Sequence, residues 1–328
     1  MEMSDKAYAA LLGLAIGDAV GMPYEMMNRK EIKEIRKEDE FFSEIPEESF
    51  VKRDLVKAEV TDDTLLTMHL AKYLIKNKGK FRRDGYFEDL AEYINNNNLI
   101  TKGIIGPSTG RTIIKITRNE NFSLSERAGF SSGLAMKIVP FGIVDDFSEQ
   151  KKILKTIEKL AYYSHYTDTA ISAAAGTASI ISSALEGKEL DSIFAEALEV
   201  MKEAENYGLR TFQASTYKRS KFLLSYLEEL ESEEALDFLS EVMGTGINSF
   251  EVFPAALSVF KLFPDSAEKA FEEALKLGGD TDTIAALTGA FIGAYNGPEV
   301  FEQEWIDELK SVNNFDFAKT AEKLLKFR

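Results

Sequence analysis

The stretch KLGGDTDTIAALTGAFIGAYNG, residues 276–297, places oxygen-bearing side chains at the start of a segment that is otherwise small and apolar. The side chains with oxygen atoms belong to four successive residues: Asp280, Thr281, Asp282 and Thr283. Residues 284–297 are rich in Ala and Gly and apolar on nearly every face, which is typical of a helix buried by other helices. Each glycine costs about 1 kcal/mol in a helix interior, so close packing must offset it. The stretch therefore predicts a central helix with an acidic entrance.

Two further segments have the same small-residue character. They are AALLGLAIGDAVG, residues 9–21, and TAISAAAGTASIISSAL, residues 169–185. Together with the opening stretch they predict three central helices. Elsewhere, apolar residues recur at spacings of three and four with charges between them. This pattern predicts amphipathic helices over residues 151–163, 190–206, 217–242, 266–277 and 318–327.

Strand-like alternation is rare in this chain. The best strand candidate is RTIIKITRN, residues 111–119, which is short and isolated. We find no clear internal repeat and no domain linker, and we expect loops over residues 28–53, 95–110, 119–125 and 244–249. The sequence predicts an all-α fold with a single domain over residues 1–328.

Composition narrows the class of protein. The chain has 328 residues, a net charge of −16 and no cysteine. A nonspecific nucleic-acid binder would carry the opposite charge, and thiolate catalysis and zinc–thiolate sites are excluded. The N-terminus lacks a basic region and Asp18 interrupts its apolar part, so we expect no signal peptide. We see no apolar run of the roughly 18–20 residues that span a bilayer. We expect a cytoplasmic enzyme with no nucleic-acid or membrane partner.

A second acidic entrance matches the first. Thr61, Asp62, Asp63 and Thr64 precede the apolar-periodic segment that ends at residue 76. Helix capping alone explains one such cluster, because Thr and Asp satisfy free backbone N–H groups at a helix start. Residues two apart on a regular helix point about 200° away from each other, so their carboxylates converge only at an entrance.

Two entrances that face each other would gather carboxylates and threonine hydroxyls around one small volume. Such carboxylates repel each other unless cations neutralise them. Oxygen-only ligands suit Mg²⁺, Mn²⁺ or Ca²⁺, and two ions roughly 3.5–4 Å apart could activate a water molecule. Glu25, at the end of GDAVGMPYE (residues 17–25), is either a solvated loop residue or a carboxylate that reaches these ions.

Four motifs, taken together and in order, carry a family resemblance. The segments GLAIGDAVGMPYE, TDDTLLTMHLA, SHYTDTAISAAAG and GGDTDTIAALTGAFIGAYNG resemble the ADP-ribosylglycohydrolase family, from about residue 7 to about residue 297. The resemblance implies an all-α orthogonal helical bundle with two Mg²⁺ or Mn²⁺ ions in a central cleft. It implies hydrolysis of the glycosidic bond at the anomeric carbon of ADP-ribose, with release of ADP-ribose from a modified protein or a small conjugate.

The same resemblance implies roles for individual residues. The implied metal ligands are Thr61, Asp62, Asp63, Asp280, Asp282 and Thr283. The implied catalytic carboxylates are Glu25, Asp62, Asp63 and Asp282. The candidates for substrate contact are Gly106 in the weaker match IGPSTGRTI, Ser131, Ser132 and Gly133 in GFSSGLAM, and His165. The serines could equally cap a helix start, and His165 could equally be a hydrogen-bonded core histidine.

Two departures bear on substrate choice. Ser132-Gly133 and Lys137 stand where arginine-specific members of the family often have an Asn-Gly pair and an Arg. The loops over residues 28–53 and 95–110 match poorly, so the sequence leaves the leaving group open. Two other functions also stay open: a non-catalytic ADP-ribose-binding or structural protein, and a two-metal hydrolase of another nucleotide-like glycoside or of a phosphoester. The sequence does not fix the oligomeric state, although a monomer is favoured.

Overall fold

The computed structural model describes residues 1–37, 40–51 and 53–328, and this part of the chain is helical, with isolated bridges and no extended strand. The prediction of an all-α fold is confirmed. The α-helices are α1 (Met3–Gly21), α2 (Arg29–Ile35), α3 (Asp62–Lys76), α4 (Arg83–Asn96), α5 (Pro107–Thr117), α6 (Leu124–Arg127), α7 (Val139–Val144), α8 (Gln150–Ala161), α9 (Asp168–Leu185), α10 (Leu190–Ala204), α11 (Thr216–Tyr226), α12 (Ser232–Phe238), α13 (Ser249–Leu262), α14 (Ala267–Leu277), α15 (Thr281–Asn296), α16 (Gln303–Val312) and α17 (Phe317–Leu325).

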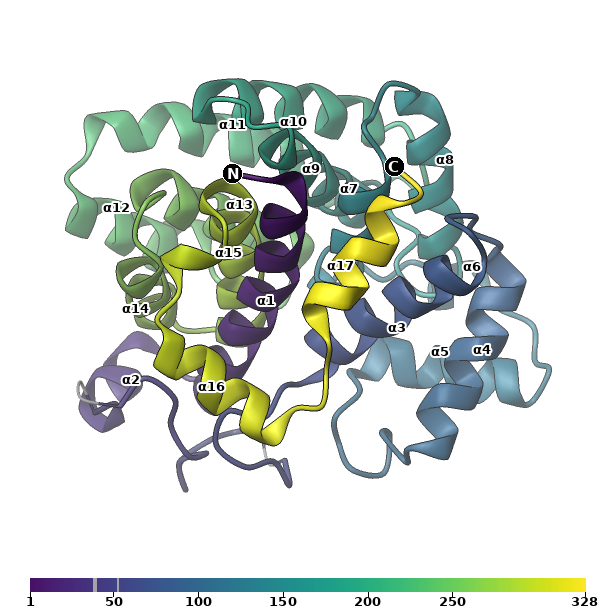
Figure 1. Cartoon of the computed structure of the whole chain (residues 1–328), viewed down its shortest axis with the longest axis horizontal. Helices are drawn as coiled ribbons and strands as arrows, with labels where there is room; N and C mark the ends of the chain where they lie inside the picture. Colours follow the sequence, from purple (N-terminus) through teal and green to yellow (C-terminus); the bar gives the residue numbers. More distant parts are fainter. Residues whose placement is uncertain (38–39, 52) are drawn as a thin grey trace.

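Helices α1 and α15 form the centre of the molecule and run antiparallel (Figure 1). Glycines make their close approach possible. A Cβ atom on Gly13 would lie 2.1 Å from the carbonyl oxygen of Gly289, so nothing larger than glycine fits there. The same crowding recurs along the contact, at Gly17 against Ala285, at Gly21 against Thr281 and at Gly293 against Ala9. The helix propensity lost at these glycines is offset by the packing of two helix backbones against each other.

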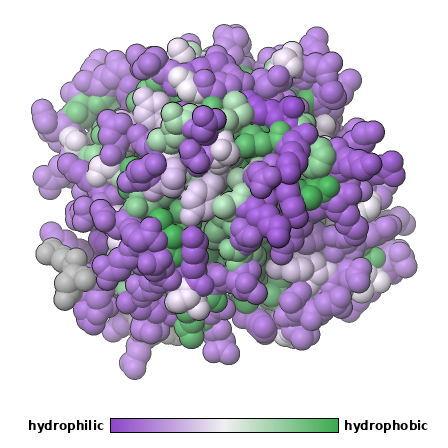
Figure 2. All heavy atoms as spheres, in the orientation of Figure 1, coloured by the Kyte–Doolittle hydropathy of each residue, from purple (hydrophilic) through white to green (hydrophobic). Residues whose placement is uncertain are grey.

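The third small-residue helix, α9, is buried along its length from Thr169 to Leu185 and contacts α7, α10, α13 and α15. In Figure 1, α17 lies alongside α1 and α16 lies below it, α4 to α6 lie on one side, and α11 to α14 lie on the other. Hydrophilic side chains predominate on the face drawn in Figure 2, and apolar ones are interspersed among them. All three helices predicted from small residues are therefore core elements.

Three local predictions were wrong. Residues 111–119 are not a strand, because their first seven residues belong to α5, which begins with Pro107 at its first position. The predicted loop over residues 28–53 contains α2. Asn28 and Glu31 cap the start of this helix by reciprocal hydrogen bonds. The predicted helix over residues 217–242 is interrupted between α11 and α12 and ends in a π-helical turn, Leu239–Met243.

The N-terminal helix corrects the inference that no apolar run is long enough to span a bilayer. Residues Met3–Tyr24 are long and apolar enough to cross a bilayer by length and composition. Within the fold, 94% of the apolar window is buried, as in the core helix of a folded domain.

Candidate metal centre and active site

The two acidic helix entrances meet in the folded chain. Helix α3 follows its N-cap Thr61, and α15 follows its N-cap Asp280. The two helices contact each other, and the charge of Asp282 acts on both Asp62 and Asp63. The predicted metal ligands are all buried: Thr61, Asp62, Asp63, Asp280, Asp282 and Thr283. The fold thus brings residues from two distant parts of the sequence into one interior cluster.

Asp18 on α1 sets the position of the α3 entrance. Its carboxylate accepts hydrogen bonds from the backbone N–H groups of Thr61 and Thr64, and from their hydroxyls at 2.8 and 2.6 Å. The Thr61 hydroxyl also accepts the backbone N–H of Asp63 at 3.3 Å, which leaves one oxygen lone pair for a cation. Sequence reasoning missed this role, because nothing in GDAVG shows that Asp18 lies beneath another helix.

The Gly278-Gly279 pair holds the loop that carries Glu25. Gly279 exchanges backbone hydrogen bonds with Met26 at 2.7 Å and Met27 at 2.9 Å. Both glycines have positive φ, and a Cβ on Gly279 would lie 2.0 Å from the carbonyl oxygen of Thr245. The backbone pairing of Gly279 with Met26 and Met27 places Glu25 beside the α15 entrance.

Glu25, Asp280 and Asp282 form the tightest group of carboxylates. Each offers an oxygen atom within 4.8 Å of the other two. Asp62 and Asp63 lie beside this group, and one oxygen of Asp62 accepts the backbone N–H of Gly106 at 3.0 Å. Gly106, a candidate substrate contact, therefore uses its amide to orient Asp62.

Two buried cations lie among these acids. The Arg53 guanidinium is 2.6 Å from Oε2 of Glu25, an ion pair whose angle departs from hydrogen-bond geometry, and 3.4 Å from Oδ2 of Asp282. Arg53 belongs to the segment over residues 28–53 that was expected to be a loop, and no sequence signal marked it. Lys137 is buried as well, and burial lowers the pKa of its amine to about 8, although the nearby charges of Asp62 and Asp63 raise it.

The carboxylates are electrostatically unfavourable as they stand. Burial first, and then the charges of neighbouring carboxylates, raise the pKa of Asp63 and Asp280 well above the usual range. Burial and the charge of Asp282 do the same to Glu25, while Arg53 opposes them. The pKa of Asp18 rises to about 7, because burial outweighs the hydrogen bonds from Thr64 and Thr61. Protonation or cation binding would reduce the repulsion among these buried carboxylates.

The residues present fit divalent cations. The cluster contains six carboxylates, from Asp18, Glu25, Asp62, Asp63, Asp280 and Asp282, against the two cations Arg53 and Lys137. Oδ2 of Asp63 is buried and has no hydrogen-bond partner among the described residues. A buried, unpartnered carboxylate oxygen is costly unless a cation or a donor meets it. Oxygen-only ligands are those of Mg²⁺, Mn²⁺ or Ca²⁺.

The predicted substrate contacts surround the same acids. The Ser132 hydroxyl donates to Asp280 at 2.9 Å, and its backbone N–H donates to Ile247, so this amide is not free for an anion. His165 contacts the hydroxyls of Ser131 at 3.0 Å and Ser164 at 2.7 Å through its two ring nitrogens. Burial, then Lys137 and Arg111, lower its pKa well below the usual value, so the ring is neutral at pH 7.

Gly133 lies against His165. A Cβ on Gly133 would lie 2.7 Å from Nε2 of the histidine, so only glycine allows this contact. One packed unit therefore lies next to the acids, and it consists of Ser131, Gly133 and His165. The position of each of these residues depends on its contacts with the others.

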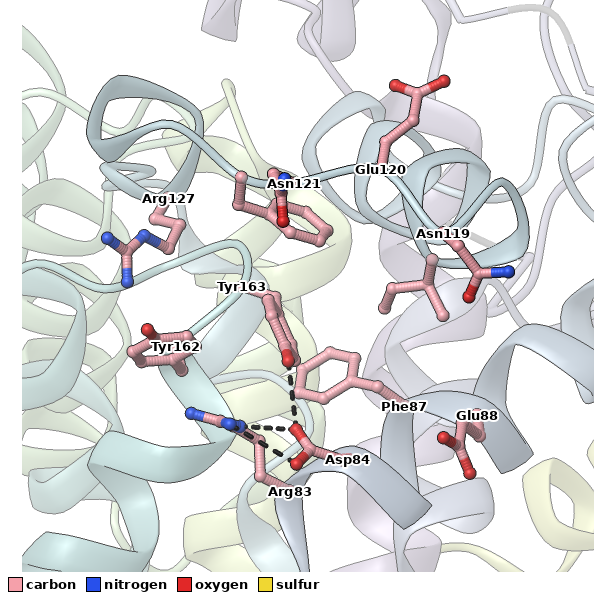
Figure 3. A pocket seen from close by; sticks show the side chains of 12 residues that line it. Arg83, Asp84, Phe87, Glu88, Asn119, Glu120, Asn121, Arg127, Tyr162 and Tyr163 are labelled. Carbon is pink, nitrogen blue, oxygen red and sulfur yellow. Dashed lines mark hydrogen bonds and ion pairs between the residues drawn. The ribbon is translucent and has the colours of Figure 1, made fainter.

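A cavity of about 720 Å³ lies elsewhere, between α4, the end of α5 and the end of α8 (Figure 3). Arg83 and Arg127 stack on Tyr162, with guanidinium carbons 4.3 and 4.6 Å from the ring centroid. Asp84 accepts hydrogen bonds from Arg83 and from the hydroxyl of Tyr163. The cavity shares no lining residue with the acidic cluster. We place the candidate active site at the acidic cluster, because its carboxylates outnumber the buried cations beside them and have raised pKa values.

Comparison with known proteins agrees with this geometry. Residues 1–327 match the family model described as ADP-ribosylglycohydrolase. The chain is 27% identical to the uncharacterized protein YegU of Escherichia coli (strain K12), over 99% of this chain and 98% of that protein. It is 24% identical to the ADP-ribosylhydrolase ARH3 of Mus musculus, over 90% of this chain and 85% of that protein. A solved structure titled ADP-ribosylglycohydrolase-related protein complex shares the fold, with a TM-score of 0.67, 20% identity and 99% coverage of both chains.

Proposed function

This chain belongs to the ADP-ribosylglycohydrolase family, and we propose that it hydrolyses the glycosidic bond between ADP-ribose and an acceptor in a reaction that depends on divalent cations. The acceptor is a protein side chain or a small molecule, and ADP-ribose is released. The observation that carries the proposal is the convergence of Glu25, Asp280 and Asp282 within 4.8 Å, beside the second acidic entrance at Asp62 and Asp63.

Two Mg²⁺ or Mn²⁺ ions would bind between the two helix entrances. The ligands would be Thr61, Asp62, Asp63, Asp280, Asp282 and Thr283. When bound, such ions polarise oxygen atoms and make water a better nucleophile at neutral pH. The unpartnered Oδ2 of Asp63 and the excess of carboxylates over buried cations support this assignment.

Glu25 is the proposed general base. It lies on a loop rather than a helix, at the rim of the cluster, and burial raises its pKa, which makes its carboxylate a stronger proton acceptor. Its carboxylate accepts the proton of the attacking water at an Oε atom. Negative charge on Asp62, Asp63 and Asp282 stabilises the positive charge that develops at the anomeric carbon.

Neutral residues next to the acids orient the substrate in this proposal. The Ser132 hydroxyl holds Asp280, and the packed unit of Ser131, Gly133 and His165 borders the same volume. His165 acts as a neutral hydrogen-bonding group, because its lowered pKa rules out an imidazolium at pH 7. Cytoplasmic location and a monomeric state are proposed as well, and rest on the sequence alone.

A substrate panel tests this function. Purified protein with Mg²⁺ or Mn²⁺ is incubated with ADP-ribosyl-arginine, ADP-ribosyl-serine, O-acetyl-ADP-ribose and a small ADP-ribosyl conjugate, and released ADP-ribose is measured by chromatography. We expect release from at least one of them, lost on chelation. If ADP-ribose binds but no substrate is cleaved, the protein is a binding member of the family and the proposed catalysis is wrong.

A further inference from the structure

Arg53 occupies the position where a cation would bind. Its Nη2 is 2.6 Å from Oε2 of Glu25, and its Nη1 is 3.4 Å from Oδ2 of Asp282. These two carboxylates and Asp280 are the group whose oxygens lie within 4.8 Å of one another. The side chain of Arg53 is only 8% exposed, so the guanidinium is inserted among the acids and does not merely cover them.

A guanidinium and a divalent ion compete for these oxygens. A Mg²⁺ ion would sit about 2.1 Å from each ligand oxygen, and Oδ2 of Asp282, which belongs to a proposed ligand, is already in contact with Arg53. Two positive charges so close together repel strongly in a buried site, where little water screens them. Binding the ion therefore favours withdrawal of the arginine.

The surroundings of Arg53 allow it to leave. Nε of Arg53 is buried and has no hydrogen-bond partner among the described residues, so its fit among the acids is incomplete. Arg53 lies between α2 and α3 and belongs to none of the helices that the described residues form, so its displacement breaks no hydrogen bond within them. Lys137, the other buried cation, has no ion pair within 4 Å among the described carboxylates and blocks no ligand oxygen.

We propose that Arg53 and one of the two divalent ions are alternative occupants of the position between Glu25, Asp280 and Asp282. This inference rests on the proposed function. The two ions then bind unequally: near Thr61, Asp62 and Asp63 the cation Lys137 acts only at a distance and forms no ion pair within 4 Å among the described residues, whereas the other ion binds only as Arg53 withdraws. Arg53 neutralises the acids in the metal-free protein and sets the cation concentration at which the second ion enters.

The test is the variant Arg53→Gln, with Arg29→Gln as a matched control. Arg29 forms an ion pair with Asp237 and has no contact with the acids. Melting temperature and calorimetric Mn²⁺ binding are measured without any turnover assay. Without metal, we expect Arg53→Gln to melt below wild type, because the acids lose their internal cation. At saturating Mn²⁺ the difference disappears, and the weaker of the two Mn²⁺ sites tightens by about 10-fold, within the usual range of coupling between ligands.

Arg29→Gln is expected to change the melting temperature equally with and without Mn²⁺. If Arg53→Gln binds Mn²⁺ no more tightly than wild type, or loses as much stability with Mn²⁺ as without it, the arginine and the ion coexist and this inference is overturned. If neither wild type nor Arg53→Gln binds Mn²⁺, the proposed metal function itself fails.

Discussion

Helices α9 and α3 begin with the same residue types, but their aspartates have opposite environments. Asp168, which follows the N-cap Thr167 of α9, accepts hydrogen bonds from the backbone N–H groups of Thr169 and Thr211 and from the Thr211 hydroxyl at 2.9 Å. Oδ2 of Asp63, after the N-cap Thr61 of α3, is buried and accepts no hydrogen bond from the part of the chain that the structure describes. The Thr-Asp pattern thus serves as an ordinary cap in one helix and leaves a free ligand oxygen in the other.

The difference teaches that the pattern itself does not identify a metal site. What distinguishes the two helix entrances is whether hydrogen-bond donors reach the buried carboxylate oxygens. At α9, a neighbouring loop supplies N–H and O–H donors to the carboxylate. At α3, the backbone N–H of Gly106 donates to Asp62, but no donor among the described residues reaches Oδ2 of Asp63. Burial, and then the charges of neighbouring carboxylates, raise the pKa of Asp63. A buried carboxylate oxygen that no donor reaches is the one that a bound cation would stabilise.

The largest expected effect comes from the acids at the α15 entrance. Replacing Asp280 and Asp282 together by Ala should lower the rate of ADP-ribose release by at least about 100-fold, the scale set by loss of one charge-stabilising group. Asp168→Asn is the matched control, and we expect it to keep near-normal release and the same Mn²⁺ dependence. A double variant that still turns over would show that the acids are not the reaction centre.

The next effect concerns how the α15 entrance is held. Gly279→Ala places a Cβ 2.0 Å from the carbonyl oxygen of Thr245 at a positive φ, so the backbone pairing with Met26 and Met27 must shift. We expect a loss of about 2 kcal/mol or more in urea unfolding, the scale of an unfavourable backbone substitution. Gly110→Ala in α5, where a Cβ meets nothing within 4 Å, should instead stabilise the fold by up to about 1 kcal/mol. Equal effects at both sites would contradict this account of the Glu25 loop.

A smaller effect is expected at the donor-rich entrance. Asp168→Ala leaves the donors of Thr169 and Thr211 unpaired, which should lower the free energy of unfolding by about 1–3 kcal/mol. The Mn²⁺-induced rise in melting temperature should be the same as in wild type. A variant that loses the Mn²⁺ response while remaining folded would remove the distinction between the two entrances.

The pH dependence of the metal-free protein gives the smallest effect. The pKa of Asp18 is raised to about 7, so the folded protein keeps this proton over a range, from about pH 4 to 7, in which the unfolded chain releases it. The contribution of Asp18 to stability is therefore lost as the pH rises through that window. Buried His69 and His165 have lowered pKa values, so their contribution makes the folded state more stable as the pH rises toward about 6.5.

The comparison with Asp18→Asn isolates this contribution, because both histidines are retained. Between pH 5 and pH 8, with a chelator present, wild type should lose on the order of 1–2 kcal/mol relative to the variant, as linkage of one raised carboxyl predicts. A difference that does not change with pH would mean that Asp18 is ionised throughout.

Much of the fold was readable from residue size and spacing. Small residues without a polar face predicted α1, α9 and α15, because only close helix contact accommodates so many glycines and alanines. The strand prediction for residues 111–119 was wrong: Pro107 suits the first position of a helix, and the buried residues Thr109, Thr112 and Ile113 recur at helical spacing. The capping box of Asn28 and Glu31 is a sequence signal for α2 that the prediction of a loop over residues 28–53 overlooked.

The candidate site was predictable only in part. The acids that cap α3 and α15, with Glu25, were found because they cluster in sequence. Asp18 and Arg53 were missed, because each acts on residues far away along the chain: Asp18 on Thr61, and Arg53 on Asp282. Local patterns report a helix entrance, whereas the partners of that entrance depend on packing between distant segments.

Thermal unfolding with Mn²⁺ and ADP-ribose tests the central claim most directly, that the entrances of α3 and α15 bind divalent cations for an ADP-ribose substrate. A ligand that binds the folded state at 100 times its dissociation constant adds about 2.7 kcal/mol of stability. We predict that Mn²⁺ raises the melting temperature of wild type, that ADP-ribose raises it further only when Mn²⁺ is present, and that the Asp280→Ala, Asp282→Ala double variant responds to neither. Equal responses of wild type and the double variant would contradict the account.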